Sequence, residues 1–359
     1  MGCMMRQIRL AKPWITDSEK QAVLDVMDSG WLTEGEKVAE FEEKLAKYVG
    51  VKHTICVPNA TLGLQFLLDL VTPGGSNVCV PAFTHPATGL AALNARHNVW
   101  FSDVCRSSGN IDQYSFDAIN HNVDLDTIVP VSWGGNPLSP DFYDEARDYG
   151  VRVVEDAACS LGAVDLSGAK VGTRAFASVF SFHPRKIITT GEGGAIVTNN
   201  GSLASSLRRL KNFGGTNFLG GTNYKMSDIN AAIGVEQLKH IDEIIHMRRI
   251  KARYYDGLLV DTDFMWRSPN IGFRTYQSYC AYVPHRDRLI HDLAELGIET
   301  QIGTYYISEL RPFQCASEFP HARALSEHLL TLPLHHEITE EDQEFVVESI
   351  ITLLKSYEV

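Results

Sequence analysis

The chain of 359 residues has no excess of positive charge, no closely spaced cysteine pair and no long apolar run. Its 44 Asp and Glu residues outnumber its 32 Lys and Arg residues, and the formal net charge is −12. We therefore expect no broad basic surface for nucleic acid or for an anionic membrane. Because no run reaches the ~18 apolar residues of a membrane-spanning helix, no membrane segment is expected either.

The seven cysteines form no C-x-x-C motif, which excludes the usual zinc-ribbon and thioredoxin-like patterns, and we predict no metal site. Free thiols in this number are typical of a reducing compartment, so we predict a cytoplasmic protein. The opening residues, MGCMMRQIRLAKPW, contain no apolar core of a secretory signal. An apolar fraction of 44% and a charged fraction of 21% are those of an ordinary globular protein.

Short apolar runs alternate along the chain with segments in which apolar residues recur at helical spacing. Strands that alternate with helices indicate a mainly parallel sheet covered on both faces, which is an α/β fold. In such a sheet, ligands bind at the carboxyl ends of the strands. The runs expected to form strands are 54–57, 77–80, 99–101, 127–131, 152–154, 178–182 and 195–197.

Two domains are predicted. A large α/β domain covers residues 1–240 and begins with a helical segment, with helices at 17–29 and 37–48. A smaller C-terminal α+β domain covers residues 241–359, and one long helix, expected over 229–258, joins the two. Further elements of the smaller domain are expected at 278–283, 286–296 and 340–354.

Lys186 lies between a predicted strand and a glycine-rich turn, in the segment SFHPRKIITTGEGG. A lysine at such a position can act as a nucleophile when its amine loses its proton. The alternative is an ordinary solvated lysine. The order of residues is not that of a P-loop, because the lysine precedes the glycines.

Asp156 ends the strand of the segment VRVVEDAACS. A buried carboxylate at a strand end needs a cation or hydrogen-bond donors. An equally simple interpretation is that Asp156 caps the next helix.

Ala60 and Thr61 follow a third strand end, in the segment CVPNATLGLQF, where a helix is expected to begin. The backbone N–H groups of a helix N-terminus bind phosphate readily. An amine, a carboxylate and a phosphate cradle at neighbouring strand ends are together what pyridoxal phosphate requires.

With these motifs in place, the sequence resembles the DegT/DnrJ/EryC/StrS sugar aminotransferases, which are fold-type-I enzymes that use pyridoxal phosphate. The resemblance rests on the motif SFH-x-x-K-x-x-T-x-GEGG, whose lysine, Lys186, stands thirty residues after Asp156. It extends over almost the whole chain. Further matching segments are SGWLTEG, VPAFTHPAT, VPVSWGGNP, TNYKMSDINAAIGVEQL, GIETQIGTYY and LPLHHEITEEDQ.

The resemblance implies a role for each matching residue. Lys186 would bind the cofactor covalently and move protons, and Asp156 would pair with the pyridine nitrogen. The phosphate would be held by Ala60, Thr61 and Ser181, and by Asn223 of a neighbouring subunit in a homodimer with shared sites. His85 would cover the pyridine ring, and Cys159 would lie near the cofactor's phenolic oxygen. The sugar end would be lined by Trp31, Tyr305 and His335.

The chain departs from the family pattern at three of these places. Ala60 replaces the usual Gly, so a positive φ there would be costly. Cys159 replaces Gln or Glu and is a poor hydrogen bonder. Lys225 replaces an Arg and lacks its bidentate fork.

The resemblance implies an aminotransferase that moves an amino group, with L-glutamate as the expected donor, to a keto carbon of a nucleotide-linked deoxysugar. Relatives that replace the reactive lysine with His are dehydratases, and Lys at position 186 favours transamination. Two alternatives remain open: an aminotransferase for a keto-cyclitol, and a pyridoxal-phosphate-binding regulatory protein with little turnover.

Overall fold

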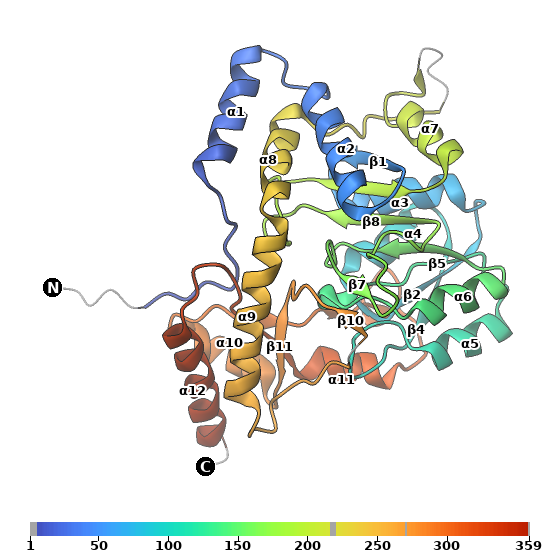
Figure 1. The fold of residues 1–359 in the computed structure, drawn as a ribbon. Helices are drawn as coiled ribbons and strands as arrows, with labels where there is room; N and C mark the ends of the chain where they lie inside the picture. Colours follow the sequence, from blue (N-terminus) through green and yellow to red (C-terminus); the bar gives the residue numbers. More distant parts are fainter. Residues whose placement is uncertain (1–5, 216–219, 270, 358–359) are drawn as a thin grey trace.

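A seven-stranded sheet runs through the larger part of the protein in the order β1-β9-β8-β6-β5-β2-β4 (Figure 1). The computed structural model describes residues 6–215, 220–269 and 271–357. Each of the seven strands coincides with one run predicted from the sequence, which confirms the predicted α/β fold. The strands are β1 (His53–Val57), β2 (Asn77–Pro81), β4 (Asn98–Ser102), β5 (Thr127–Ile128), β6 (Arg152–Asp156), β8 (Ala177–Ser181) and β9 (Gly194–Thr198).

Strands β4, β2, β5, β6 and β8 are parallel, so their carboxyl ends meet at one edge of the sheet. Strands β9 and β1 are antiparallel to their neighbours and close the other side of the sheet. Residues 56–61, 156–163 and 181–190 follow the ends of β1, β6 and β8, which brings the three predicted motifs into one part of the molecule.

Helices cover both faces of this sheet, as the alternating side chains of the strands require. Ile55 and Val57 of β1 pack with one group of helices, α3 (Ala60–Val71), α4 (Pro86–Asn94) and α7 (Gly201–Leu210). Cys56 points to the opposite face, where α2 (Glu36–Val49) and α8 (Asp228–Lys239) pack. A further apolar cluster forms where α5 (Gln113–Asn122) and α6 (Pro140–Asp148) pack with Cys79 of β2, Ile128 of β5 and Val153 of β6.

The N-terminal helices are fixed by side-chain caps. Helix α1 (Asp17–Ser29) begins with a capping box between Thr16 and Glu19. The carboxylate of Asp228, on α8, accepts hydrogen bonds from the backbone N–H groups of Gly35 at 2.8 Å and Val38 at 3.0 Å. Asp228 therefore supplies the cap that α2 lacks in its own sequence.

The prediction of a single long helix over 229–258 is wrong in one respect. Two helices, α8 and α9 (Ile241–Leu259), meet at His240, whose backbone leaves the helical region (φ −106°, ψ 3°). The apolar spacing continues through this break because residues on both sides face the same core, so periodicity did not reveal it.

A second, three-stranded sheet lies in the C-terminal part, in the order β11-β14-β12. It packs with α9, α10 (Arg286–Glu295) and α12 (Glu340–Tyr357), and Ile8 from the start of the chain joins the same core. The division predicted at residue 240 stays a prediction. The strands are β11 (Tyr279–Tyr282), β12 (Gln301–Ile302) and β14 (Leu329–Leu332).

Two short strand pairs connect distant parts of the chain. Strand β13 (Tyr305–Tyr306) pairs with β3 (Phe83–Thr84), and β10 (Gly272–Phe273) pairs with β7 (Val164–Asp165). Helix α11 (Pro320–His328) packs beside the first of these pairs. Within the described residues, no helix has both the length and the apolar character to cross a membrane.

Candidate active site

Lys186 lies on the turn that follows β8. Its backbone N–H donates to the carbonyl of His183 at 2.9 Å, which fixes the turn. Its half-buried side chain reaches Cys159, with Nζ 3.1 Å from Sγ. The carbonyl of Arg185 accepts from Nε2 of Gln277 at 2.9 Å, so the C-terminal part of the chain also supports this turn. The solvated surface position considered from the sequence does not match this environment.

Asp156 ends β6 and is only 5% exposed. Its Oδ2 accepts from the hydroxyl of Thr88 at 2.8 Å, and its Oδ1 accepts from the N–H of Ala158 at 3.1 Å. The residues after Asp156 form turns rather than a helix. The helix-cap interpretation of Asp156 is therefore wrong, and a buried carboxylate held in one orientation remains.

The neighbouring acid, Glu155, points to the other face of the sheet. Its carboxylate accepts from the hydroxyl groups of Ser132 and Ser178. Burial raises the pKa of Glu155, and these hydrogen bonds oppose that rise. Because adjacent side chains of a strand alternate, only Asp156 faces the side on which Thr88 lies.

The N-terminus of α3 forms the predicted cradle. Asn59 is the N-cap: its Oδ1 accepts from the N–H of Leu62 at 2.9 Å, and its carbonyl accepts from Gly63 at 3.0 Å. In the first turn of a helix, the N–H groups of Ala60 and Thr61 have no intrahelical acceptor, so they remain for a ligand. Ala60 is not among the described residues with positive φ, so the cost expected from losing the family's Gly does not arise.

Gly194 lets the cradle lie close to the strands. It pairs with Ser181, the last residue of β8, across the antiparallel ladder. A Cβ at position 194 would lie 2.8 Å from the backbone N of Ala60 and 2.8 Å from the carbonyl carbon of Asn59. Only glycine therefore allows Ser181 and the N-terminus of α3 to approach to this distance.

His85 and Tyr305 form one wall near these groups. The Nδ1 atom of His85 accepts from the N–H of Ala87 at 3.2 Å and so caps α4. The pairing of β13 with β3 places the ring of Tyr305 edge-on to His85, with centroids 5.8 Å apart. Loss of hydration lowers the pKa of His85, the charge of Lys186 lowers it further, and the charge of Asp156 raises it.

The remaining predicted residues make no hydrogen bond or ring contact with Lys186 or Asp156 among the described residues. They are Trp31, His335 and Asn223. Trp31 is 60% exposed and donates to the carbonyl of Glu34 at 3.2 Å. Asn223 is exposed and accepts from the N–H of Lys225 at 3.5 Å.

His335 is 7% exposed and belongs to the interior. Burial lowers its pKa to about 4, and the neighbouring His336 adds to the shift. Its Nδ1 accepts from the N–H of Glu337 at 3.2 Å. Its Nε2 is buried without a hydrogen-bond partner among the described residues, and the place of His335 at the sugar end stays a prediction.

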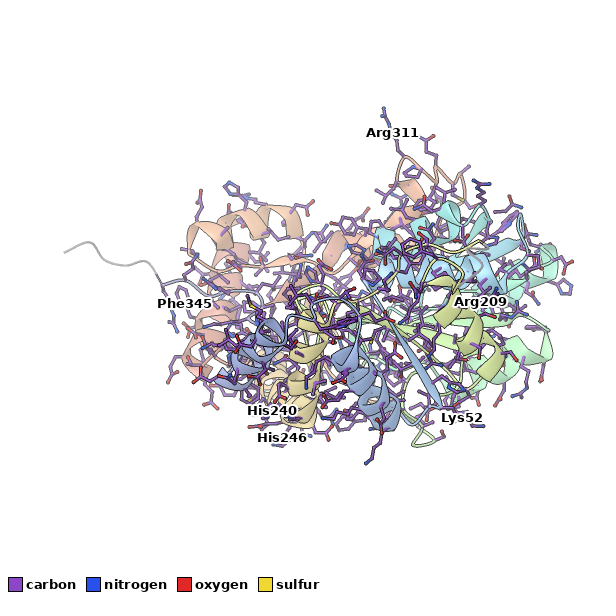
Figure 2. All side chains as sticks on the ribbon, turned by 90° about the horizontal axis from the view of Figure 1, so that it is seen from above. Lys52, Arg209, His240, His246, Arg311 and Phe345 are labelled. Atoms are coloured by element: carbon purple, nitrogen blue, oxygen red, sulfur yellow. The ribbon has the colours of Figure 1, made fainter. Side chains whose placement is uncertain are left out.

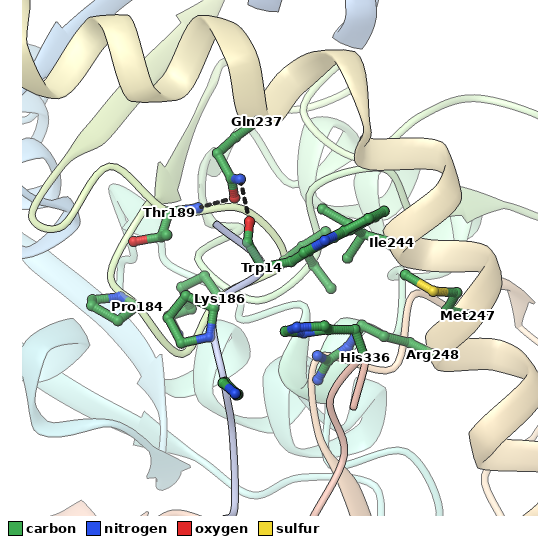
Figure 3. Close-up of a pocket in the computed structure, with 12 residues that line it drawn as sticks. Trp14, Pro184, Lys186, Thr189, Gln237, Ile244, Met247, Arg248 and His336 are labelled. Carbon is green, nitrogen blue, oxygen red and sulfur yellow. Dashed lines mark hydrogen bonds between the residues drawn. The ribbon is translucent and has the colours of Figure 1, made fainter. Parts of the chain in front are cut away.

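A small cavity lies behind the turn of Lys186 (Figure 3). Its volume of about 20 Å³ is enough for one water molecule and too small for a cofactor. Gln237 donates to the carbonyl of Trp14 at 2.7 Å and accepts from the N–H of Thr189 at 3.4 Å, and the ring of His336 stacks on Trp14. These contacts help to fix the turn that contains Lys186.

Thr88 is the residue that the sequence analysis missed. It is fully buried, donates to Asp156 and is 2.9 Å from the hydroxyl of Thr84. The sequence did contain a signal for Thr88. It stands three residues after His85 in VPAFTHPAT, so in a helix the two residues lie about one turn apart. The site thus gathers an amine, an oriented carboxylate and free helix N–H groups, which can hold a ligand with a carbonyl, a ring nitrogen and a phosphate.

Almost the whole chain is similar to known sugar aminotransferases. The profile of the DegT/DnrJ/EryC1/StrS aminotransferase family matches residues 13–351. A UDP-4-amino-4,6-dideoxy-N-acetyl-beta-L-altrosamine transaminase of Campylobacter jejuni is 30% identical, over 95% of this chain and 96% of its own. A GDP-perosamine synthase of Caulobacter vibrioides is 30% identical, over 97% of this chain and 98% of its own. The structure of DesI, determined with its TDP-sugar product, is 30% identical and superposes with a TM-score of 0.90 over 98% of this chain and 94% of that one.

Proposed function

The chain belongs to the DegT/DnrJ/EryC1/StrS aminotransferase family, and from this premise we propose that it uses pyridoxal phosphate to transfer an amino group to a keto carbon of a nucleotide-linked sugar. The observation that carries the proposal is the meeting of Lys186, Asp156 and the N-terminus of α3 at one edge of the sheet. Two 30% identical relatives are named for UDP- and GDP-linked amino sugars, which favours a nucleotide sugar over a keto-cyclitol.

The residues of the site fit pyridoxal phosphate. The free N–H groups of α3 and the hydroxyl of Ser181 would hold the phosphate, and the room that Gly194 leaves permits their approach. Asp156 would pair with the ring nitrogen. When bound, the cofactor supplies the carbonyl carbon that takes up the amino group and a ring that withdraws electrons. A protein that only binds the cofactor would not need the reactive amine and the oriented acid together.

Within this proposal, each side chain has one task. Lys186 would hold the cofactor through Nζ and, once released, would accept the proton from the α-carbon of the amino donor and, in the second half-reaction, deliver a proton to the sugar carbon that receives the amino group. Asp156 keeps a proton on the ring nitrogen by its negative charge, and Thr88 fixes the direction of its carboxylate. His85 and Tyr305 cover the site from the side of β3 and β13 and exclude water.

Transfer of labelled nitrogen tests the proposed function. With ¹⁵N-labelled L-glutamate and a nucleotide-linked keto sugar, we expect ¹⁵N in the sugar and one 2-oxoglutarate for each amino sugar, measured by mass spectrometry. The kinetics should be ping-pong, because both half-reactions use Lys186. A deoxygenated product without ¹⁵N would point to a dehydratase and would contradict the proposal. Absence of any turnover with a panel of UDP-, GDP- and TDP-linked keto sugars would favour the regulatory alternative.

We further propose that the active unit is a homodimer in which Asn223 completes the site of the partner. Asn223 is exposed and makes no hydrogen bond with Lys186 among the described residues of its own chain, as expected of a residue that acts on the neighbouring subunit. Helix α1 and the residues after it expose apolar side chains, which include Leu24, Met27, Trp31 and Leu32. An exposed apolar patch of this kind is typical of a subunit interface. Part of the glycine-rich loop before Asn223, residues 216–219, lies outside the described residues.

Complementation between two inactive variants should reveal a shared site. We expect the Lys186→Ala and Asn223→Ala proteins to be weak alone and to recover activity when their subunits exchange. If Asn223 acts across the interface, a mixed dimer has one site with both defects and one site with neither. Activity is measured after verified exchange. No recovery, or a fully active monomer, would show that each chain forms its own site.

The phosphate cradle gives a separate prediction. We expect Gly194→Ala to lower affinity for pyridoxal phosphate about tenfold or more, because the new Cβ would meet backbone atoms of Asn59 and Ala60 that cannot move aside cheaply. Affinity is measured by absorbance titration of the cofactor-free protein. Pyridoxal, which lacks the phosphate, should bind about equally to both proteins.

A matched control is Gly201→Ala, at the start of α7. A Cβ there meets only the ring of His53 at 3.5 Å, which is an ordinary contact. This variant should bind pyridoxal phosphate as the unaltered protein does. Equal losses of affinity for pyridoxal and for its phosphate in Gly194→Ala would mean that the cradle has been misplaced.

A further inference from the structure

A second cavity, of about 260 Å³, lies between the end of α9 and two later stretches of the chain, residues 265–268 and 274–280. Asp256 comes from α9, and the other charged groups of its wall, Arg267 and Arg274, come from these two stretches. Trp266, Tyr276 and Tyr279 supply aromatic surface. The volume is below the roughly 300–1,000 Å³ of sites for drug-sized ligands, so it suits a molecule of about the size of an amino acid.

Arg274 lies where it can bind a ligand in the cavity. Its guanidinium lies over the rings of Trp266 and Tyr276, with Cζ 5.5 and 4.5 Å from the ring centroids. Its Nη2 donates to the carbonyl of Ser278 at 3.3 Å, whereas its buried Nε has no hydrogen-bond partner among the described residues. Burial lowers the pKa of Arg274. A buried guanidinium donor left without an acceptor is costly, and a bound carboxylate would remove that cost.

The charges of the wall identify the chemical class of the ligand. Asp256 accepts from the hydroxyl of Tyr279 through Oδ1 at 2.8 Å, and it is the one carboxylate among the described residues that line the cavity. Two guanidinium groups and one carboxylate are the complement of two carboxylates and one ammonium. A phosphate dianion matches this set poorly, because Asp256 would repel it.

We propose that this cavity binds an acidic amino acid, with its carboxylates on Arg274 and Arg267 and its ammonium group on Asp256. The cavity shares no lining residue with the group around Lys186. A hydrogen bond connects the neighbourhood of the cavity to that group. Gln277, three residues after Arg274, donates to the carbonyl of Arg185, the residue before Lys186. The site is therefore additional to the reactive one, and its occupancy does not depend on the cofactor.

Binding of L-glutamate to the Lys186→Ala protein tests the proposal, because that protein cannot turn the amino acid over. By isothermal titration calorimetry we expect one molecule bound per chain in addition to any that binds in the site around Lys186. Adding Arg274→Met should weaken binding about tenfold or more, since a charged hydrogen-bond partner is lost. Arg311→Met is the matched control, because Arg311 is exposed at the surface (Figure 2) and does not line the cavity, and it should change nothing.

Asp256→Asn separates the ammonium subsite from the carboxylate subsites. It should weaken binding of L-glutamate but not of glutarate, which has the two carboxylates and no ammonium group. Arg274→Lys keeps the charge without the planar fork, and it should weaken both ligands if Arg274→Met does not fold.

Three results would overturn the proposal: no binding of L-glutamate, binding that Arg274→Met and Arg274→Lys leave unchanged, or equal effects of Asp256→Asn on L-glutamate and glutarate. Binding of inorganic phosphate in preference to L-glutamate would also overturn it. This site rests on no step of the proposed function, which is read separately from ¹⁵N in the sugar with the unaltered protein: transfer of ¹⁵N without binding in the cavity would overturn only the further site.

Discussion

Lys186→Ala is expected to abolish amino transfer while the protein remains folded. Loss of the proton-transferring group alone lowers the rate by about 10²–10⁴-fold, and the covalent attachment of the cofactor is lost as well. Because Lys186 contacts only Cys159 through its side chain among the described hydrogen bonds, its removal should cost little stability. Activity is measured with L-glutamate and the keto sugar, and folding is measured by thermal unfolding.

Two further variants make this prediction specific. Lys186→Arg keeps the positive charge but cannot lose its proton, so it should be as inactive as Lys186→Ala. Lys52→Ala removes an exposed lysine at the surface (Figure 2) and should leave the rate unchanged. An active Lys186→Arg protein would mean that position 186 contributes only charge.

Asp156→Asn is expected to lower the rate by about 10²–10³-fold, the usual effect of removing one preorganised electrostatic group from a reacting site. Asn has nearly the shape of Asp, and it can accept from the N–H of Ala158 while its NH₂ group donates to the hydroxyl of Thr88, so the site should keep its geometry. What it loses is the negative charge that holds a proton on the ring nitrogen. The rate of each half-reaction and the affinity for the cofactor are measured separately.

Glu155→Gln is the matched control for this variant. Glu155 is the adjacent acid of the same strand, is equally buried, and faces Ser132 and Ser178 on the opposite side of the sheet. Its neutral replacement should keep the rate near that of the unaltered protein. Similar losses in both variants would mean that the sheet needs a buried carboxylate for stability rather than for chemistry.

The strands of the main sheet could be predicted because each is a short run of apolar residues bounded by turn signals. The side chains at their carboxyl ends could then be placed together, since parallel strands end at one edge. Lys186 and Asp156 were found in this way. The resemblance to a known family added Ser181, His85 and Asn223, whose individual segments have no distinctive pattern of their own.

Contacts between distant segments could not be predicted. Strand β13 has two residues and exists because it pairs with β3, more than 200 positions earlier in the chain. The same pairing places Tyr305 beside His85, and the packing of α4 against the sheet places Thr88 beside Asp156. The burial of His335, which is 7% exposed, likewise depends on packing that its own segment does not show. Each of these outcomes is decided by tertiary contacts that local spacing does not encode.

The covalent position of the cofactor tests the central claim most directly. The protein is loaded with pyridoxal phosphate, reduced with borohydride, digested and mapped by mass spectrometry. We predict that the phosphopyridoxyl mass is found on the peptide that contains Lys186, at about one per chain. Attachment to another lysine such as Lys170 or Lys225, or no attachment despite saturating cofactor, would contradict the account.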